Sequence, residues 1–367
     1  MGARERKNGW TPLHVAAVNG QHAVVRLLVG ARADVGARDD VEDTALVLAA
    51  QRGCATTVKM LLDAGANVGA HGRGRCTSLM WAAQEGREEV VRVLLDAGAS
   101  TAAAMDDGST ALILAVWKGR EGVVRMLLGA GADVSAGQKD KCTPLHYSVQ
   151  DAGRSAISTM LLDAGADVNA VEIDGFSVLH RASKFGQAWA VGMLVEAGAE
   201  LAATDDCGYS ALHSAAREGH AEVAQALLDA GVEVHLKDID GRTALLVAAY
   251  EGGEGVIKTL LAAGADVAAT DDEGFTALHN AAQQNQQGAA RLLLAAGADM
   301  AAETVWEDTP HCLARKKWHL DMVALLRLEA QARRSMAFAM GLQERLGAAS
   351  VVRWLEPGVL RMMAEFA

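Results

Sequence analysis

Five histidines recur at one position of a repeating pattern, and they are the first residues to consider as metal ligands: His14, His146, His180, His213 and His279. A zinc or iron site needs three or four ligands grouped in space, whereas each period of this sequence supplies a single histidine. At the same position other periods carry Val47, Met80, Ile113 or Leu246, so the position accepts apolar side chains. The pattern indicates a structural role and predicts no metal site.

Other residues with chemical potential form no complete constellation. Cys142 and His146 are four residues apart, but they lie across a turn and a helix start within one period, so a catalytic pair is not expected. The run Asp238-x-Asp240-Gly241 is similar to the start of a calcium loop but lacks the downstream glutamate. The motifs G-x-x-x-x-G-K-[ST], G-x-S-x-G and H-E-x-x-H do not occur. We therefore expect no enzymatic activity and no cofactor.

The composition argues against several classes of function. A net charge of −12 over 367 residues disfavours nucleic-acid and anionic-membrane binding, because phosphate contacts need a basic face. The five cysteines are scattered without a C-x-x-C pair, which favours a reducing compartment over a disulfide framework. The start, MGARERKNGW, has no apolar segment typical of a signal peptide, and no run approaches ~18 apolar residues. We expect a soluble, monomeric, cytoplasmic protein, with the nucleus as the alternative location.

The elements that carry these residues repeat with a period of 33. A Thr or Ser precedes an apolar helix start at Thr11, Thr44, Thr77, Thr110, Thr143, Ser177, Ser210, Thr243, Thr276 and Thr309. One interval, between Thr143 and Ser177, has 34 residues, and the extra residue falls in the irregular stretch from Asp151 to Ser155. Self-similarity at such a period is typical of a solenoid built from about ten units.

Each period predicts two short helices and a turn. The Thr or Ser hydroxyl caps the first helix, which ends at a glycine such as Gly53 or Gly86. A second helix with paired apolar residues, for example Val93 and Leu94, stops at another glycine such as Gly98. A polar turn, often Asp-x-x-Gly, then projects from the stack. Because hydrophobic residues make up 51% of the chain and aromatic residues only 4%, we expect thin interior layers of Ala, Leu and Val.

Two motifs resemble the ankyrin repeat: T-P-L-H at Thr11–His14 and Thr143–His146, and L-L-D-A-G-A-D-V-N-A at Leu161–Ala170. The resemblance is specific because it recurs ten times in register. It implies an all-α repeat solenoid whose units are helix-turn-helix with a β-turn finger, and a histidine that hydrogen-bonds backbone in the turn. This chain departs from the pattern at Arg32, which replaces a helix-ending glycine, and in a degenerate tenth unit.

The pattern divides the chain into three segments. Residues 1–6 lead into the array, residues 7–327 form the repeats, and residues 328–367 form a C-terminal amphipathic helical extension. The helix is expected to continue to residue 346, and Pro357 starts another helix. Such helices either cap the open apolar end of the last repeat or dock another protein. The second alternative makes the chain an adaptor, for example one that recruits substrates to a ubiquitin ligase.

Positions four, seven and eight after the cap share one face of the first helix, and in the family this face is similar to the lining of a concave groove. On that face the chain places Trp81, Trp117, Lys118, Tyr147, Arg181, Lys184, Phe185, Arg217 and Tyr250. The residue before the cap, at the tip of the turn, is Trp10, Phe176, Tyr209 or Phe275 in four units. Nine of the 15 aromatic residues thus fall at positions expected to be exposed.

Clustered aromatic residues with interspersed cations are typical of interface hot spots. We predict a protein or peptide partner across units three to eight, anchored by aromatic rings and held by cations that meet its acidic groups. The anchors are Trp117, Tyr147, Phe185 and Tyr250, and the cations are Arg181, Lys184 and Arg217. The alternative is that Trp81 and Tyr147 only fill the seam between repeats. Asn169 also resembles the asparagine that intracellular hydroxylases modify in ankyrin proteins.

Overall fold

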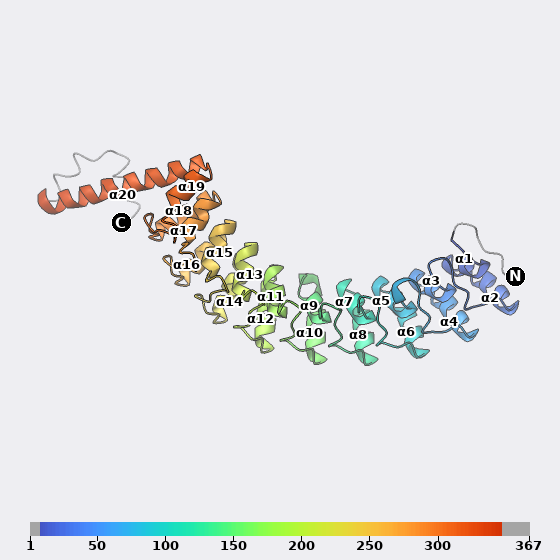
Figure 1. The fold of residues 1–367 in the computed structure, drawn as a ribbon. Helices are drawn as coiled ribbons and strands as arrows, with labels where there is room; N and C mark the ends of the chain where they lie inside the picture. The colour runs from blue at the N-terminus through green and yellow to red at the C-terminus, as the bar shows by residue number, and fades with distance from the viewer. Residues whose placement is uncertain (1–7, 347–367) are drawn as a thin grey trace. The chain divides into compact units, whose positions relative to one another are not determined.

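The computed structural model describes residues 8–346, with side chains through residue 338. Over this range the chain forms ten pairs of antiparallel helices, numbered α1 to α20 (Figure 1). The contacts divide the chain into two compact parts, residues 1–206 and residues 207–367, which we call the N-terminal and C-terminal parts. The predicted all-α repeat solenoid is confirmed.

The N-terminal part contains six helix pairs. Its first helices are α1 (Pro12–Val18), α3 (Ala45–Arg52), α5 (Ser78–Glu85), α7 (Ala111–Trp117), α9 (Pro144–Ser148) and α11 (Val178–Lys184). Its second helices are α2 (His22–Gly30), α4 (Ala55–Asp63), α6 (Glu88–Asp96), α8 (Glu121–Gly129), α10 (Ser155–Asp163) and α12 (Ala188–Glu196). Short 3₁₀ turns lie at Arg73–Arg75 and Ala152–Arg154, and the second of these holds the extra residue of the long interval.

The C-terminal part contains four helix pairs. Its first helices are α13 (Ala211–Glu218), α15 (Ala244–Glu251), α17 (Ala277–Gln283) and α19 (Pro310–Lys316). Its second helices are α14 (Ala221–Asp229), α16 (Glu254–Ala262), α18 (Gln287–Ala295) and α20 (Leu320–Leu346). Because α20 runs without a break through residue 327, the predicted boundary between array and extension falls inside a helix. Residues 347–367, including the helix predicted from Pro357, lie outside the described residues.

The helix boundaries follow from capping chemistry. The Thr276 hydroxyl accepts the N–H of His279, and His279 Nδ1 accepts the N–H of Thr276 at 3.1 Å, so the two residues satisfy each other's backbone. Gly53 ends α3 in the left-handed region, with φ 84°, as its place in the sequence predicts. Arg32 adopts φ 58° at the position where other repeats have glycine, which costs about 1 kcal/mol.

Within each part, every first helix packs on the first helix of the next repeat, and most second helices stack in the same way. Alanine pairs such as Ala82 and Ala83 are fully buried between the first helices, and Leu94 and Leu127 fill the layer below. The small side chains let neighbouring helices approach closely. No helix among residues 8–346 is long and apolar enough to cross a bilayer.

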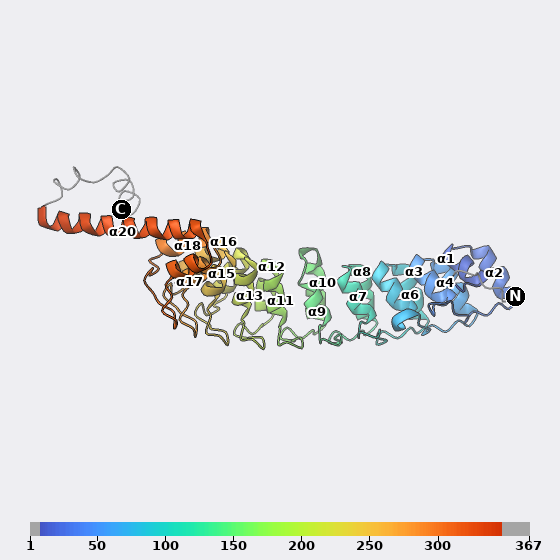
Figure 2. The same cartoon turned by 45° about the horizontal axis from the view of Figure 1, so that its top comes forward.

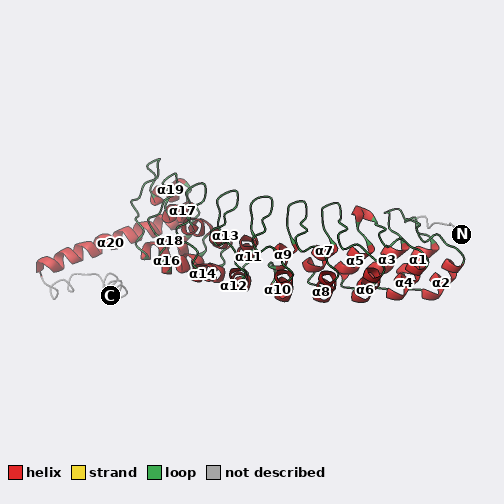
Figure 3. Ribbon diagram, turned by 90° about the horizontal axis from the view of Figure 1, so that it is seen from below, coloured by secondary structure: helices red, strands yellow, loops and turns green. Residues whose placement is uncertain are grey.

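A finger precedes each first helix from α3 onward, and the fingers of each part project to the same side (Figures 2 and 3). Most fingers donate one backbone N–H to the finger before them, for example from Lys139 to Asp107 O at 3.0 Å. The same bond joins Ile239 N to Cys207 O at 3.2 Å. Backbone hydrogen bonds therefore connect successive fingers, and this connection does not depend on which side chains the fingers carry.

Candidate partner-binding face

The repeated histidines hold first helices to the following fingers. His213 Nδ1 accepts the N–H of Ser210 at 3.2 Å, and its Nε2 donates to the carbonyl of Arg242 at 2.9 Å. His279 makes the same connection to Asp308 O at 2.9 Å. These partners identify the Nε2–H tautomer. The backbone hydrogen bonding that the resemblance implies for this histidine is thus observed.

The pKa values of Cys142 and His146 are shifted in the directions opposite to those of a reactive thiolate and imidazolium. Burial raises the pKa of Cys142 to about 11. Burial, with the nearby charge of Arg181, lowers the pKa of His146 to about 4. A nucleophilic cysteine needs a lowered pKa and a base that accepts a proton near neutral pH. The arrangement favours a neutral thiol and a neutral imidazole.

The lowered pKa of His146 predicts a loss of stability in acid. The unfolded chain takes up a proton near pH 6.5, whereas the native protein resists it until about pH 4. The contribution of His146 to the stability of the native state is therefore fully present above pH 6.5, and it is lost as the pH falls toward 4. We expect His146→Gln, which can keep the capping bond, to lose less stability than wild type over this window in urea titrations. An equal loss in both proteins would contradict this.

We call the surface formed by the first helices and the fingers the inner face. Trp117, Phe185 and Tyr250 lie on it with exposed fractions of 44%, 41% and 44%. Lys118 Nζ lies 4.0 Å from the centre of the Trp117 ring, and Lys184 Nζ lies 5.8 Å from the Phe176 ring. The N-terminal part thus presents two exposed aromatic rings, each at the same end of its helix as an exposed lysine.

The predicted finger-tip residues are less exposed than expected. Trp10 is half-buried and donates its indole N–H to Asp39 at 2.9 Å, while Phe176 packs 5.1 Å from the His180 ring. Tyr209 packs in the same way on His213. For Phe275 the expectation of exposure is wrong. The ring is only 8% exposed, because it lies against the rings of His279 and Trp306.

Arg181, predicted to meet a partner, is bound inside the chain. Its guanidinium makes two contacts with Glu172, at 2.6 and 2.7 Å, and lies 5.7 Å from the Tyr147 ring. The Tyr147 hydroxyl in turn donates to the side chain of Gln138. Arg181 and Glu172 are 17% and 14% exposed. This network joins two fingers and two first helices, which favours the seam-filling alternative for Tyr147; Trp81 is also half-buried.

In the C-terminal part the inner face contains a hollow of about 400 Å³. The rings of Tyr209, Tyr250 and Phe275 line it, and Arg217 borders it. Arg242, another lining residue, lies 5.6 Å from the Tyr209 ring. Its charge is balanced inside the chain, because it contacts Asp238 and Asp240 at 2.8 Å each.

Three carboxylates in this hollow were not predicted from the sequence: Glu251, Asp271 and Glu273. Glu251 ends α15, next to Tyr250, and the other two lie in the finger before α17. Asp271 Oδ1 accepts the N–H groups of Glu273 and Phe275, at 3.0 and 2.8 Å, and so shapes that finger. Glu251 directly follows Tyr250, which was predicted to be exposed, and this position was the sequence signal that could have indicated a carboxylate on the inner face.

Asn169 lies outside the inner-face helices, in the turn after α10. Its side-chain oxygen accepts the N–H of Glu200 at 2.8 Å, and its own N–H donates to Asp167 at 2.9 Å. The asparagine therefore connects two successive repeats. Its modification stays a prediction.

Comparison with known families agrees with this architecture. The family model described as "Ankyrin repeats (3 copies)" matches residues 1–72, 46–138, 131–205, 179–271 and 212–304. The comparison with curated proteins gives no match. The matches end at residue 304 and leave out the whole α19–α20 pair, which agrees with a degenerate last unit. Ankyrin repeats generally mediate protein–protein interaction, and this chain belongs to the ankyrin repeat family.

Proposed function

We propose that the chain is a non-catalytic scaffold that binds a protein or peptide on the inner face of its repeats. The observation that carries the proposal is the exposure of Trp117 and Tyr250 at the ends of helices whose preceding residues are buried. In α7 every residue before Trp117 is buried, and in α15 every residue before Tyr250 is buried. Rings at these sites stay substantially exposed in the isolated chain, and rings of this kind dominate the energetics of interfaces.

The surroundings of the rings support a polar peptide or protein partner. Lys118 and Lys184, near Trp117 and Phe185, favour acidic groups of the partner in the N-terminal part. The net charge of −12 disfavours nucleic acid. A second candidate, the adaptor role, is favoured by α20, which has 27 residues and exposes Leu328 and Phe338. The role of residues 328–367 as a cap of the array or as a docking element stays a prediction.

The double variant Trp117→Ala/Tyr250→Ala tests the scaffold directly. Because both rings are substantially exposed, we expect the stability to change by no more than about 1 kcal/mol. Loss of two hot-spot rings should weaken partner capture at least ~30-fold, measured by quantitative mass spectrometry of proteins retained on the immobilised chain.

Leu27→Ala is the matched control, because Leu27 is exposed on α2, a second helix away from the inner face. It should retain every captured protein. A large fall in the melting temperature of the double variant would show that the rings are structural. Unchanged capture by a stably folded double variant would refute the binding role.

A further inference from the structure

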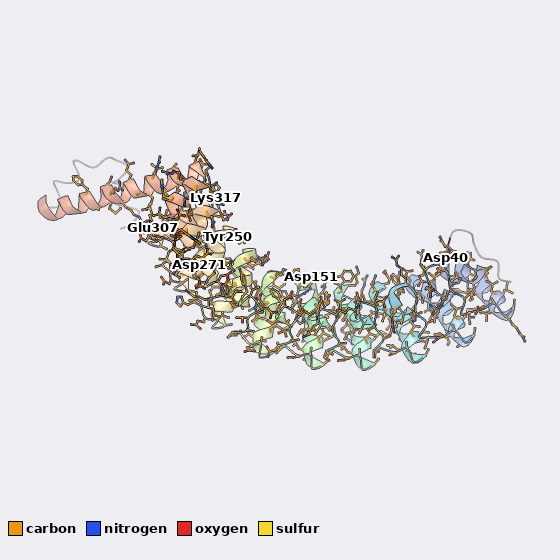
Figure 4. All side chains as sticks on the ribbon, viewed as in Figure 1. Asp40, Asp151, Tyr250, Asp271, Glu307 and Lys317 are labelled. Atoms are coloured by element: carbon orange, nitrogen blue, oxygen red, sulfur yellow. The ribbon has the colours of Figure 1, made fainter. Side chains whose placement is uncertain are left out.

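The hollow in the C-terminal part combines an exposed tyrosine with carboxylates. Tyr250 lies beside Glu251 in sequence, and Glu273 reaches the same hollow from the neighbouring finger. Figure 4 labels Tyr250 and Asp271 near each other in the C-terminal part. Neither Glu251 nor Glu273 forms an ion pair within the described residues. Their charges therefore face the hollow without a cation of their own.

The other two tyrosines of the chain show what such a group binds. Tyr147 has the guanidinium of Arg181 at 5.7 Å, and that guanidinium is held by Glu172. Tyr209 has the guanidinium of Arg242 at 5.6 Å, and this one is held by Asp238. In both cases a planar cation lies near a ring and bonds a carboxylate, which is the combination that suits arginine better than lysine.

Tyr250 has the ring and the carboxylates but lacks the guanidinium. Among the described residues no Arg or Lys lies over its ring. The C-terminal end of α15, where Tyr250 and Glu251 stand, adds the partial negative charge of its carbonyl groups. Arg181 and Arg242 each lie one repeat after their tyrosine in the same register, and the residue at that position after Tyr250 is the uncharged Gln283, which also lines the hollow.

The balance of charge in the hollow favours a cationic occupant. Three carboxylates line it, and of its two arginines Arg242 is already neutralised by two aspartates. Arg217 is the one lining cation that contacts no described carboxylate, and it repels a second cation from the rim. A volume of about 400 Å³ lies within the range of ligand pockets, ~300–1,000 Å³.

We propose that this hollow receives an arginine side chain from a peptide segment of the partner. The guanidinium lies against the Tyr250 ring and bonds Glu251 and Glu273, as Arg181 and Arg242 do at their own tyrosines. The proposal rests on the binding function proposed above, and it names the chemistry that one part of the inner face recognises.

Random peptides displayed on phage and selected on the full chain supply the probe. A selected peptide is then synthesised twice, with arginine and with citrulline, which is neutral but nearly the same shape. We expect the citrulline form, and the variant Glu251→Gln/Glu273→Gln with the arginine form, each to lose at least ~10-fold in affinity by fluorescence polarisation. Arg217→Gln should bind the arginine form more tightly, because it removes a like charge.

The variant Glu222→Gln/Glu233→Gln is the matched control, because it removes the same charge from exposed residues of the C-terminal part outside the hollow. It should bind like wild type. Peptides that depend on Tyr250 but are weakened by Arg217→Gln and not by Glu251→Gln/Glu273→Gln would overturn the arginine site and leave the scaffold intact. Selected peptides insensitive to both Tyr250→Ala and Trp117→Ala, or no selected peptide at all, count against the scaffold itself.

Discussion

Arg181→Ala is expected to destabilise the N-terminal part by about 3 kcal/mol. The substitution removes both contacts to Glu172, whose carboxylate is only 14% exposed, and leaves that charge without its cation in a poorly hydrated site. It also removes the guanidinium next to Tyr147, so the link between the two fingers is weakened. Urea denaturation followed by circular dichroism measures the loss. Because each repeat contacts only its neighbours, unfolding of this region alone also counts as the expected result.

Arg125→Ala is the control for this experiment. Arg125 pairs with Glu121 at the same distance of 2.8 Å, but the two side chains are 69% and 50% exposed. Exposed pairs contribute little, so the cost should stay below about 0.5 kcal/mol. Equal costs for the two substitutions would show that the Arg181 pair is solvated and would return Arg181 to the candidates for partner binding.

Gly208→Ala is expected to destabilise the C-terminal part by about 3 kcal/mol. Gly208 has φ +75°, which costs an alanine about 1 kcal/mol by itself. A Cβ atom there would also stand 2.8 Å from Ile239 N and 3.1 Å from Asp238 Cα, so backbone of the next finger must move, at a further cost of ~1–3 kcal/mol. That movement strains the bond from Ile239 N to Cys207 O.

Gly219→Ala separates the two causes. Gly219 has nearly the same φ, +78°, but no atom lies within 4 Å of the Cβ position. Its substitution should cost only about 1 kcal/mol, read from the same thermal and urea unfolding curves. If both variants lose the same stability, close packing of the fingers does not contribute to the stability of the array.

The fold could be predicted from the sequence because the same local structural signals recur in every repeat. The hydroxyl caps, the left-handed glycines and the buried alanine pairs each act within one unit and its neighbour, so ten copies reinforce one prediction. Arg32 at φ 58° shows that register outweighs the preference of a single residue. The period ends at residue 327, whereas the predicted helix through residue 346 belongs to α20, which begins at Leu320, so the end of the period does not coincide with the end of a helix.

The inner face was harder to predict, because exposure there depends on pairs of residues from different repeats. Periodicity placed Trp117, Phe185 and Tyr250 on the correct face, where they are exposed. It could not show that Arg181 finds Glu172 in the adjacent finger, or that Phe275 lies against Trp306 one repeat later. Periodicity also predicted that cations of the inner face contact the partner, but it did not predict the carboxylates around Tyr250.

Hydroxyl-radical footprinting of the isolated chain, and of its complex with a selected peptide, tests the central claim most directly. The measurement reports the oxidation rate of each aromatic ring by mass spectrometry. The account predicts rapid oxidation of Tyr250 in the isolated chain and strong protection in the complex, while buried Phe275 reacts slowly in both. Slow oxidation of Tyr250 in the isolated chain, or no protection by a bound peptide, would contradict it.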